Sequence, residues 1–210
     1  MNGKIVMDCI DAAYASIRQH ADELMVLDQT IGDGDHVFNL TRGLEALRGI
    51  RGDIELLDFG PALKLAAAKV LSTVGGSSGP LFSSLLLGMS RACDDLNGDP
   101  RGYAQMYAAG VKAVQDRGKT GKGSKTMMDV LIPVAERWNK LVQDAPGARQ
   151  ILAELPREAN RGMLATRAML ATKGRASFLG ERSVGHIDPG ARSSELMITA
   201  VCERLGESYR

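Results

Sequence analysis

The chain has 210 residues, and its 26 Lys and Arg against 25 Asp and Glu leave a net charge of +1. This length suits one domain with a sizeable core, so we expect a single domain over residues 1–210. Nucleic-acid-binding proteins typically have a concentrated basic surface or aromatic side chains that stack on bases, and the balanced charge and the 4% of aromatic residues exclude both. No apolar run reaches the roughly 18 residues of a membrane span, and the opening residues lack the apolar centre of a secretion signal, so we expect a soluble, cytoplasmic protein that binds neither membranes nor nucleic acid.

Apolar residues recur at spacings of three and four along most of the chain, which predicts an all-α fold of about eight helices. The expected helices and breaks, in chain order, are a helix over 3–20, a loop over 28–35, a helix through Phe38 to Leu47, a helix capped by Asp58 and ended by Gly75-Gly76, a helix opened by Pro80, a turn at Asn97-Gly98-Asp99-Pro100, helices over 102–117 and 125–142, a break at Ala145-Pro146-Gly147, a long helix to Lys173, and a last helix over 193–205. Pro133 predicts a bend and Pro156 a kink or restart, because a proline inside a helix costs about 3 kcal/mol or more.

Two further features of the pattern concern loops and thiols. Residues 174–191 show no helical periodicity, and unstructured loops beyond about 12–15 residues are usually functional or disordered. The turn residues Asp188-Pro189-Gly190 within this segment favour a functional loop. Three widely separated cysteines without a CxxC pair predict free, buried thiols: Cys9, Cys93 and Cys202.

The most informative motif is the acidic segment Asp28-Gln29-Thr30-Ile31-Gly32-Asp33-Gly34-Asp35-His36. In an extended segment Asp33 and Asp35 project in the same direction, and the flanking glycines allow the loop to curl back toward Asp28. Three converging carboxylates repel one another, and a divalent cation with a preference for oxygen ligands resolves that repulsion. The segment therefore predicts a Mg²⁺ or Ca²⁺ site formed by Asp28, Asp33 and Asp35.

Two alternatives to a magnesium site can be compared with the spacing. An EF-hand loop beginning at Asp28 would need Gly at its sixth position and Glu at its twelfth, where Asp33 and Asn39 stand, so this type of calcium site is excluded. The simpler alternative is a solvated acidic turn in which Asp35 caps the second helix.

Three other segments are candidates for contact with a phosphate-bearing ligand. Residues 74–80 form a small-residue loop before a helix N-terminus, which favours anions but equally suits a tight turn. Residues 117–127 are rich in Gly and Lys, yet Ser124 stands where a P-loop requires Lys, so only a basic, flexible segment is expected. In the third segment Arg175 and Arg182 could hold phosphate oxygens, and Asp188 could accept from a ribose hydroxyl or cap the last helix.

Three kinds of side chain near these motifs have two interpretations each. For His36 and His186 an orienting or capping role is favoured over catalysis. Met127 and Phe178 could flank an adenine ring, although core packing explains them equally well.

Taken together in this order, the motifs resemble the nucleotide-binding L subunit (DhaL) of dihydroxyacetone kinases, and the resemblance covers essentially the whole chain. The segments that carry it are Asp28…Gly32-Asp33-Gly34-Asp35-His36…Asn39, Gly75-Gly76-Ser77-Ser78-Gly79-Pro80-Leu81, Lys125-Thr126-Met127…Asp129, and Gly174-Arg175-Ala176-Ser177 through Asp188-Pro189-Gly190-Ala191. The resemblance implies a barrel of eight antiparallel helices with the nucleotide at one rim.

The resemblance also implies ligands and partners. Asp28, Asp33 and Asp35 would bind two Mg²⁺ ions that bridge the phosphates of ADP or ATP. The residues implied to line the nucleotide are His36, Asn39, Ser77, Ser78, Gly118, Met127, Arg175, Asp188 and Gly190. The ketose would be held by a separate dihydroxyacetone-binding K subunit, and a phosphocarrier of the sugar phosphotransferase system would recharge the bound ADP. Whether the chain also forms a homodimer is left open.

The sequence departs from the family pattern at two positions: Val37 stands where the family usually has Gly, and Ser124 where it usually has Asp. These departures leave the exact substrate and the phosphoryl donor open. Two other functions are compared with the phosphocarrier-dependent one. The first is an L subunit that exchanges free ATP at each turnover and serves a related ketose. The second is a nucleotide-sensing module that regulates another protein.

Overall fold

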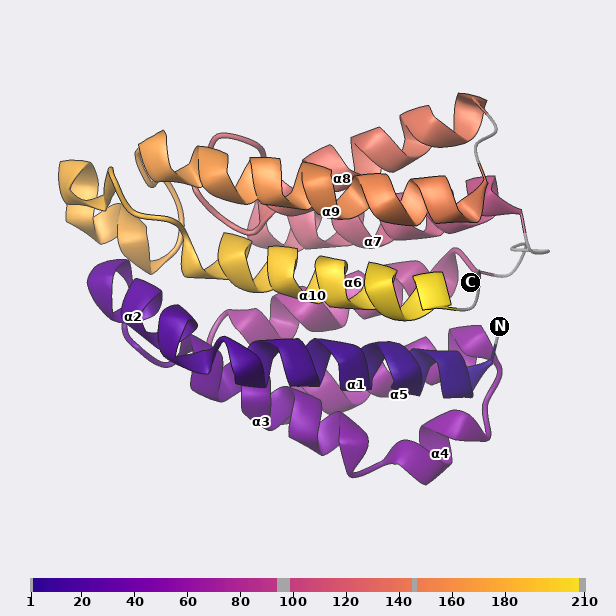
Figure 1. Cartoon of the computed structure of the whole chain (residues 1–210). Helices are drawn as coiled ribbons and strands as arrows, with labels where there is room; N and C mark the ends of the chain where they lie inside the picture. Colours follow the sequence, from indigo (N-terminus) through magenta and orange to yellow (C-terminus); the bar gives the residue numbers. More distant parts are fainter. Residues whose placement is uncertain (1, 94–98, 145–146, 208–210) are drawn as a thin grey trace.

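The repeated apolar spacing forms helices along most of the chain in the computed structural model, which describes residues 2–93, 99–144 and 147–207 (Figure 1). The α-helices are α1 Gly3–Gln19, α2 Ala21–Ile31, α3 His36–Arg48, α4 Arg51–Glu55, α5 Phe59–Thr73, α6 Ser78–Arg91, α7 Pro100–Gly118, α8 Met128–Leu141, α9 Ala148–Ala165 and α10 Pro189–Gly206. Three 3-10 segments are η1 Val142–Asp144, η2 Thr166–Ala168 and η3 Arg175–Ser183. The described residues contain no strand beyond an isolated bridge between Asn2 and Asp58, so the predicted all-α fold is confirmed.

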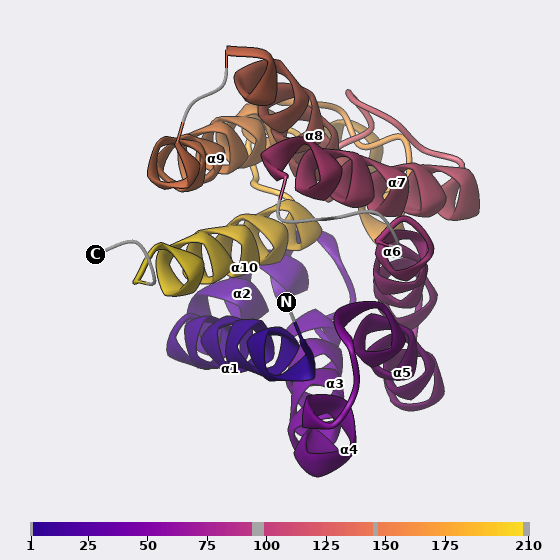
Figure 2. The same cartoon turned by 90° about the vertical axis from the view of Figure 1, so that its right-hand side faces the viewer.

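Eight of these described helices close into a ring. Each packs against two neighbours in the order α1, α10, α9, α8, α7, α6, α5, α3 and back to α1. Figure 2 views this ring nearly end-on, and Figure 1 shows that the chain begins and ends on the same side. Helices that are neighbours in this ring run antiparallel to one another (Figure 1). The expected eight-helix barrel is therefore confirmed, and α2 and α4 are additional short helices in its connections.

The interior of the ring is filled by three adjoining groups of apolar side chains. One lies among α7, α8, α9 and α10, a second among α1, α3, α5 and α6, and a third where α1, α2, α3 and α10 meet. Phe82 of α6 packs against all three groups. None of the described helices combines the length and hydropathy that crossing a bilayer requires.

Helix α2 is the main element that the periodicity did not predict. Its buried residues are Leu24, Asp28 and Ile31, so a carboxylate occupies a position on the inward face where an apolar residue is normally expected. The polar residue obscures the apolar stripe, and residues 28–31, expected in a loop, are the last turn of a helix. Asp28 therefore reaches the acidic loop from a rigid element.

Several helix ends also differ from the prediction. Helix α10 starts at Pro189 rather than at residue 193, and the predicted helix to Lys173 ends at Ala165 and continues as η2. Pro156 lies inside the single helix α9, so the expected restart does not occur. The neighbouring Leu155 and Ala159 are buried and pack in the core, which holds the helix together across the proline.

Some predicted breaks fall partly on residues that are not described. Asn97 and Gly98 of the expected turn, and Ala145 and Pro146 of the expected break, lie outside the described residues. Asp99 and Pro100 begin α7, where the Asp99 side chain accepts a hydrogen bond from the backbone N–H of Arg101 at 2.9 Å. Cys9, Cys93 and Cys202 are thiols that form no disulfide; Cys202 is buried and the other two are partly buried.

Candidate functional site

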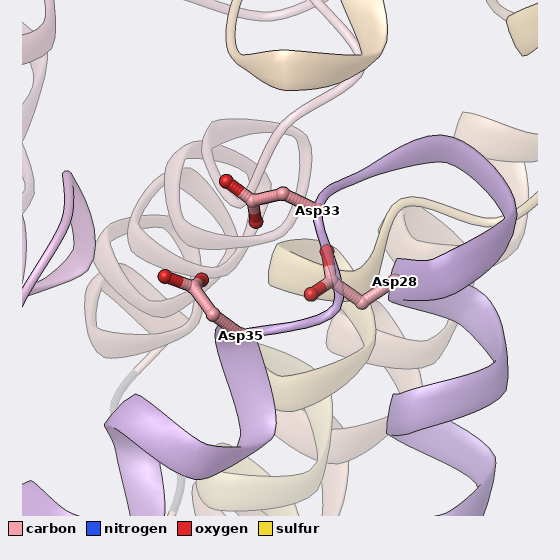
Figure 3. Close-up of side chains that lie close together, drawn as sticks. All are labelled: Asp28, Asp33 and Asp35. Atoms are coloured by element: carbon pink, nitrogen blue, oxygen red, sulfur yellow. The ribbon is translucent and has the colours of Figure 1, made fainter.

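Three carboxylates meet where α2 gives way to α3. Asp28 lies in the last turn of α2, and Asp33 and Asp35 lie in the short loop that follows (Figure 3). Each offers one oxygen, and these oxygens all lie within 4.8 Å of one another. Asp28 is 5% exposed, whereas Asp33 and Asp35 are open to solvent. The structure thus brings together the trio that the sequence predicted, although Asp28 approaches from a helix and not from a curled loop.

Two glycines give the loop this shape. Gly34 has φ +79°, a conformation that side chains disfavour. A Cβ at Gly32 would lie 1.9 Å from the Oδ1 atom of Asp28, so any side chain there would displace that carboxylate. The second oxygen of Asp28 accepts a hydrogen bond from the backbone N–H of His36 at 3.0 Å. Asp28 therefore accepts a hydrogen bond from a backbone N–H in the first turn of α3, whereas Asp35, at the N-cap position, makes no side-chain capping bond.

The chemistry of this trio fits a magnesium ion. Three carboxylates so close together repel one another, and the partial burial of the group limits how far water can screen the repulsion. Carboxylate oxygens are the ligands that Mg²⁺ prefers, and Mg²⁺ sites with few protein ligands complete their coordination with water and substrate phosphates. Arg175 of η3 supplies one compensating charge, with its Nε atom 2.8 Å from the Oδ2 atom of Asp33.

The N-terminus of α6 faces the same region. Gly76 has φ +63°, and a Cβ at Gly79 would lie 2.2 Å from the carbonyl oxygen of Val74, so small residues are required for this turn. Ser77 and Ser78 follow Gly76 and present hydroxyl groups beside the unpaired backbone N–H groups of the helix start, an arrangement that favours anions.

His36 links this turn to the last helix. Its Nε2 atom lies 2.9 Å from the hydroxyl of Ser193 and its Nδ1 atom 3.5 Å from that of Ser78. Burial lowers the pKa of His36, although the neighbouring Asp28 carboxylate opposes this shift. A neutral imidazole in this position orients hydroxyl groups on both sides, which agrees with the orienting role favoured from the sequence.

A cavity of about 670 Å³ extends from the carboxylates between α6, α7, α8 and α10. Its lining includes all but one of the predicted metal and nucleotide residues, namely Asp28, Asp33, Asp35, His36, Ser77, Ser78, Gly118, Met127, Arg175, Asp188 and Gly190. Asn39 is buried just behind the wall, where its side-chain oxygen accepts from Arg42 at 2.9 Å. Phe178 lines the cavity and is 83% exposed, so it is not a core residue.

Part of the cavity lining is apolar. Leu81, Phe82 and Val114 belong to it, and none of them was a predicted site residue. Each follows the apolar spacing of its helix, so in the sequence it cannot be distinguished from a core residue. Thr120 and Thr126 also line the cavity; they belong to the segment 117–127, but neither was a predicted site residue. Lys173 is a further lining residue that no motif included.

Asp188 caps the last helix, as one of its two interpretations predicted. Its Oδ2 atom accepts from the backbone N–H of Ala191 at 2.7 Å. Burial raises the pKa of Asp188 to about 7, while the hydrogen bond from Ala191 opposes that rise. Asp188 also lines the cavity, so the capping role is compatible with contact to a ribose hydroxyl.

Several other expectations for the site are not supported by the structure. Arg182 and His186 are exposed and do not line the cavity. The segment 117–127 is not uniformly flexible and basic, because Lys125 is fully buried. Of the two departures from the family pattern, Val37 packs in the core with Ile17 and Leu40, and Ser124 lies outside the cavity.

Comparison with known proteins gives consistent results. Residues 30–203 match the model of the DAK2 domain. The chain is 40% identical over 187 residues to the PEP-dependent dihydroxyacetone kinase 1, ADP-binding subunit DhaL, of Listeria innocua, covering 89% of each chain. It is 37% identical to the PTS-dependent dihydroxyacetone kinase, ADP-binding subunit DhaL, of Lactococcus lactis, covering 89% of this chain and 90% of that one.

Longer relatives and solved structures match over part of their length. The chain is 30% identical to an L-erythrulose 1-kinase of Mycolicibacterium smegmatis, covering 87% of this chain and 32% of that one. The crystal structure of the dihydroxyacetone kinase from C. freundii in complex with AMP-PNP and Mg²⁺ superposes with a TM-score of 0.72 at 20% identity, covering 98% of this chain and 34% of that chain. At this identity the structural match supports the fold alone.

Proposed function

The chain belongs to the DAK2 domain family, among the DhaL-type subunits of dihydroxyacetone kinase, and we propose that it holds a magnesium-bound adenine nucleotide and relays its phosphoryl group to a ketose. The observation that carries this proposal is the trio of Asp28, Asp33 and Asp35 in the lining of a cavity large enough for a nucleotide. In this proposal the three aspartates bind two Mg²⁺ ions, and bound Mg²⁺ neutralises charge on the phosphate oxygens.

The remaining residues of the cavity have separate roles in this proposal. Ser77 and Ser78, at the start of α6, donate hydrogen bonds to phosphate oxygens, and Arg175 adds positive charge at the opposite side. The base packs against the apolar part of the lining, near Gly118 and Met127, and the Asp188–Gly190 turn faces the ribose. Asn39 acts from behind the wall by supporting the turn at Gly75 and Gly76. Phosphoryl transfer depends mostly on positioning and charge, so no general base is required of this chain.

We propose that the ketose and the phosphoryl donor are supplied by other proteins. The relatives named as ADP-binding subunits align over 85–90% of their length, and their names state dependence on PEP or the PTS. By that likeness this chain acts in a kinase complex in which a K subunit holds dihydroxyacetone and a phosphotransferase-system phosphocarrier recharges bound ADP.

A second candidate is an L subunit that exchanges free ATP and serves a related ketose. The similarity to the L-erythrulose 1-kinase favours this candidate, although that identity, 30%, is below the 40% found for the Listeria subunit. Native mass spectrometry of the purified chain distinguishes the two. The phosphocarrier-dependent function predicts ADP and Mg²⁺ retained at one nucleotide per chain, and kinase activity when a K subunit and the phosphocarrier proteins are added. A chain that releases its nucleotide rapidly and works with ATP alone would support the second candidate.

Replacing Arg175 by Gln is expected to weaken ADP binding about 10-fold, because the variant loses a charged hydrogen-bond donor at the phosphate end of the cavity. Arg182→Gln is the matched control, since Arg182 belongs to the same segment η3 but lies outside the cavity. Isothermal titration calorimetry with Mg–ADP measures the affinity of both variants. Equal affinities in the two variants would exclude Arg175 from the phosphate site.

A further inference from the structure

Lys125 is a fully buried lysine beside the cavity. Its exposed fraction is 0%, although lysine is almost never buried completely. It also has φ +58°, and Lys119 is the only other non-glycine residue with a positive φ in the described part of the chain. A residue that is both buried and held in a disfavoured conformation requires strong local support.

That support comes from two segments distant in sequence. The Nζ atom of Lys125 donates a hydrogen bond to the carbonyl oxygen of Thr166, at 2.6 Å, and another to the carbonyl oxygen of His186. Burial lowers the pKa of Lys125, while the carboxylates of Asp188 and Asp129 oppose this shift. The ammonium thus ties the loop between α7 and α8 to η2 and to the turn that precedes α10.

The residues that Lys125 holds are linked to the cavity wall through Thr166 and Met127. The hydroxyl of Thr166 accepts from the backbone N–H of Asp188 at 3.1 Å. Met127 follows Lys125 by two residues, and a Cβ at Gly190 would lie 3.7 Å from the Cβ of Met127, so these two parts of the wall are in contact. Met127, Asp188 and Gly190 all line the cavity, whereas Lys125 does not.

We propose that Lys125 is a positioning residue that fixes the nucleoside-facing wall of the cavity, formed by Met127 and the Asp188–Gly190 turn, without touching the nucleotide. The inference rests on the proposed function, because it assumes that the cavity binds a nucleoside diphosphate. The carboxylates and Ser77 lie on other elements, α2, its following loop and the α5–α6 turn, so Lys125 does not hold the phosphate end.

This division between the two ends of the cavity provides the test. Lys125→Met fills a similar volume but removes the two hydrogen bonds, so the wall loses its attachment. We expect the dissociation constant of Mg–ADP to rise about 10- to 100-fold. Mg–pyrophosphate, which has no nucleoside, is expected to bind within about twofold of the native value. Isothermal titration calorimetry after removal of bound nucleotide measures both ligands on the intact chain.

Thr166→Val is a second variant that decides the question if Lys125→Met does not fold. It keeps the backbone carbonyl that Lys125 contacts but removes the hydroxyl that holds Asp188, so the same selective loss of ADP affinity is expected, about 10-fold. Native ADP affinity in the folded variants, or an equal loss of ADP and pyrophosphate affinity, would overturn the role of Lys125. A native chain that binds neither ligand would instead overturn the proposed function, and this inference with it.

Discussion

Asp33→Asn is expected to abolish Mg²⁺-dependent ADP binding while the helical content stays native. The substitution keeps the shape of the side chain but removes one of three negative charges that converge within 4.8 Å. Mg²⁺ binds few protein carboxylates and depends strongly on each, so we expect the dissociation constant of ADP with Mg²⁺ to rise about 100-fold or more. Asp33 lies in an exposed loop, and its ion pair with Arg175 is on the surface, so its loss costs the fold little.

The measurement is ADP titration with and without Mg²⁺, together with far-UV circular dichroism. Asp22→Asn is the matched control: it removes the same charge from the first turn of α2, the helix that carries Asp28, at an exposed position outside the cavity. The control is expected to bind Mg–ADP as the native chain does. Native affinity in Asp33→Asn would show that the aspartates do not form the metal site, and a loss in both variants would point to the net charge of the region.

The acidic trio could be predicted from the sequence because its chemistry is local. Asp33 and Asp35 are two residues apart, glycines flank them, and charge repulsion requires no knowledge of the fold. The approach of Asp28 could not be predicted in the same way. Its carboxylate occupies an inward position of α2, so the very residue that completes the site also interrupts the apolar pattern that would have revealed the helix.

The closed ring of helices and the apolar part of the cavity lining depend on contacts that periodicity does not contain. The spacing shows that α1 and α10 each have an apolar face, but not that these helices, at opposite ends of the chain, pack together. The resemblance to a known family supplied that information. Leu81 and Val114 illustrate the same limit within the site, because a cavity wall and a core present identical patterns until the neighbouring helices are placed.

The Gly and Lys content of residues 117–127 predicts a basic, flexible segment, whereas Lys125 within it is fully buried. Its burial depends on the carbonyl groups of Thr166 and His186, which are 41 and 61 residues away. No local signal identifies such partners. Buried charges of this kind are therefore recognised from the structure, where the acceptors are visible.

Gly162→Ala is expected to destabilise the chain by about 3 kcal/mol, although alanine is the better helix former by about 1 kcal/mol. A Cβ at Gly162 in α9 would lie 2.2 Å from the carbonyl oxygen of Asp129 in α8. The atom in the way belongs to the backbone, so the two helices would have to separate, and the steric cost exceeds the gain in propensity. Urea unfolding should show the loss, and the melting temperature should fall by roughly 5–10 °C.

Gly52→Ala provides the matched control, because Gly52 lies in helix α4 with nothing within 4 Å of the added Cβ; it is expected to be neutral or stabilising by up to about 1 kcal/mol. The Gly162 substitution is also expected to alter the nucleotide site. The carboxylate of Asp129 accepts from the backbone N–H groups of Gly123 and Thr126, so a displaced Asp129 moves the segment that contains Lys125 and Met127. ADP affinity is therefore expected to fall in the folded fraction of Gly162→Ala and to stay native in Gly52→Ala. Stability that is equal in the two variants would show that α8 and α9 have room to separate at this crossing.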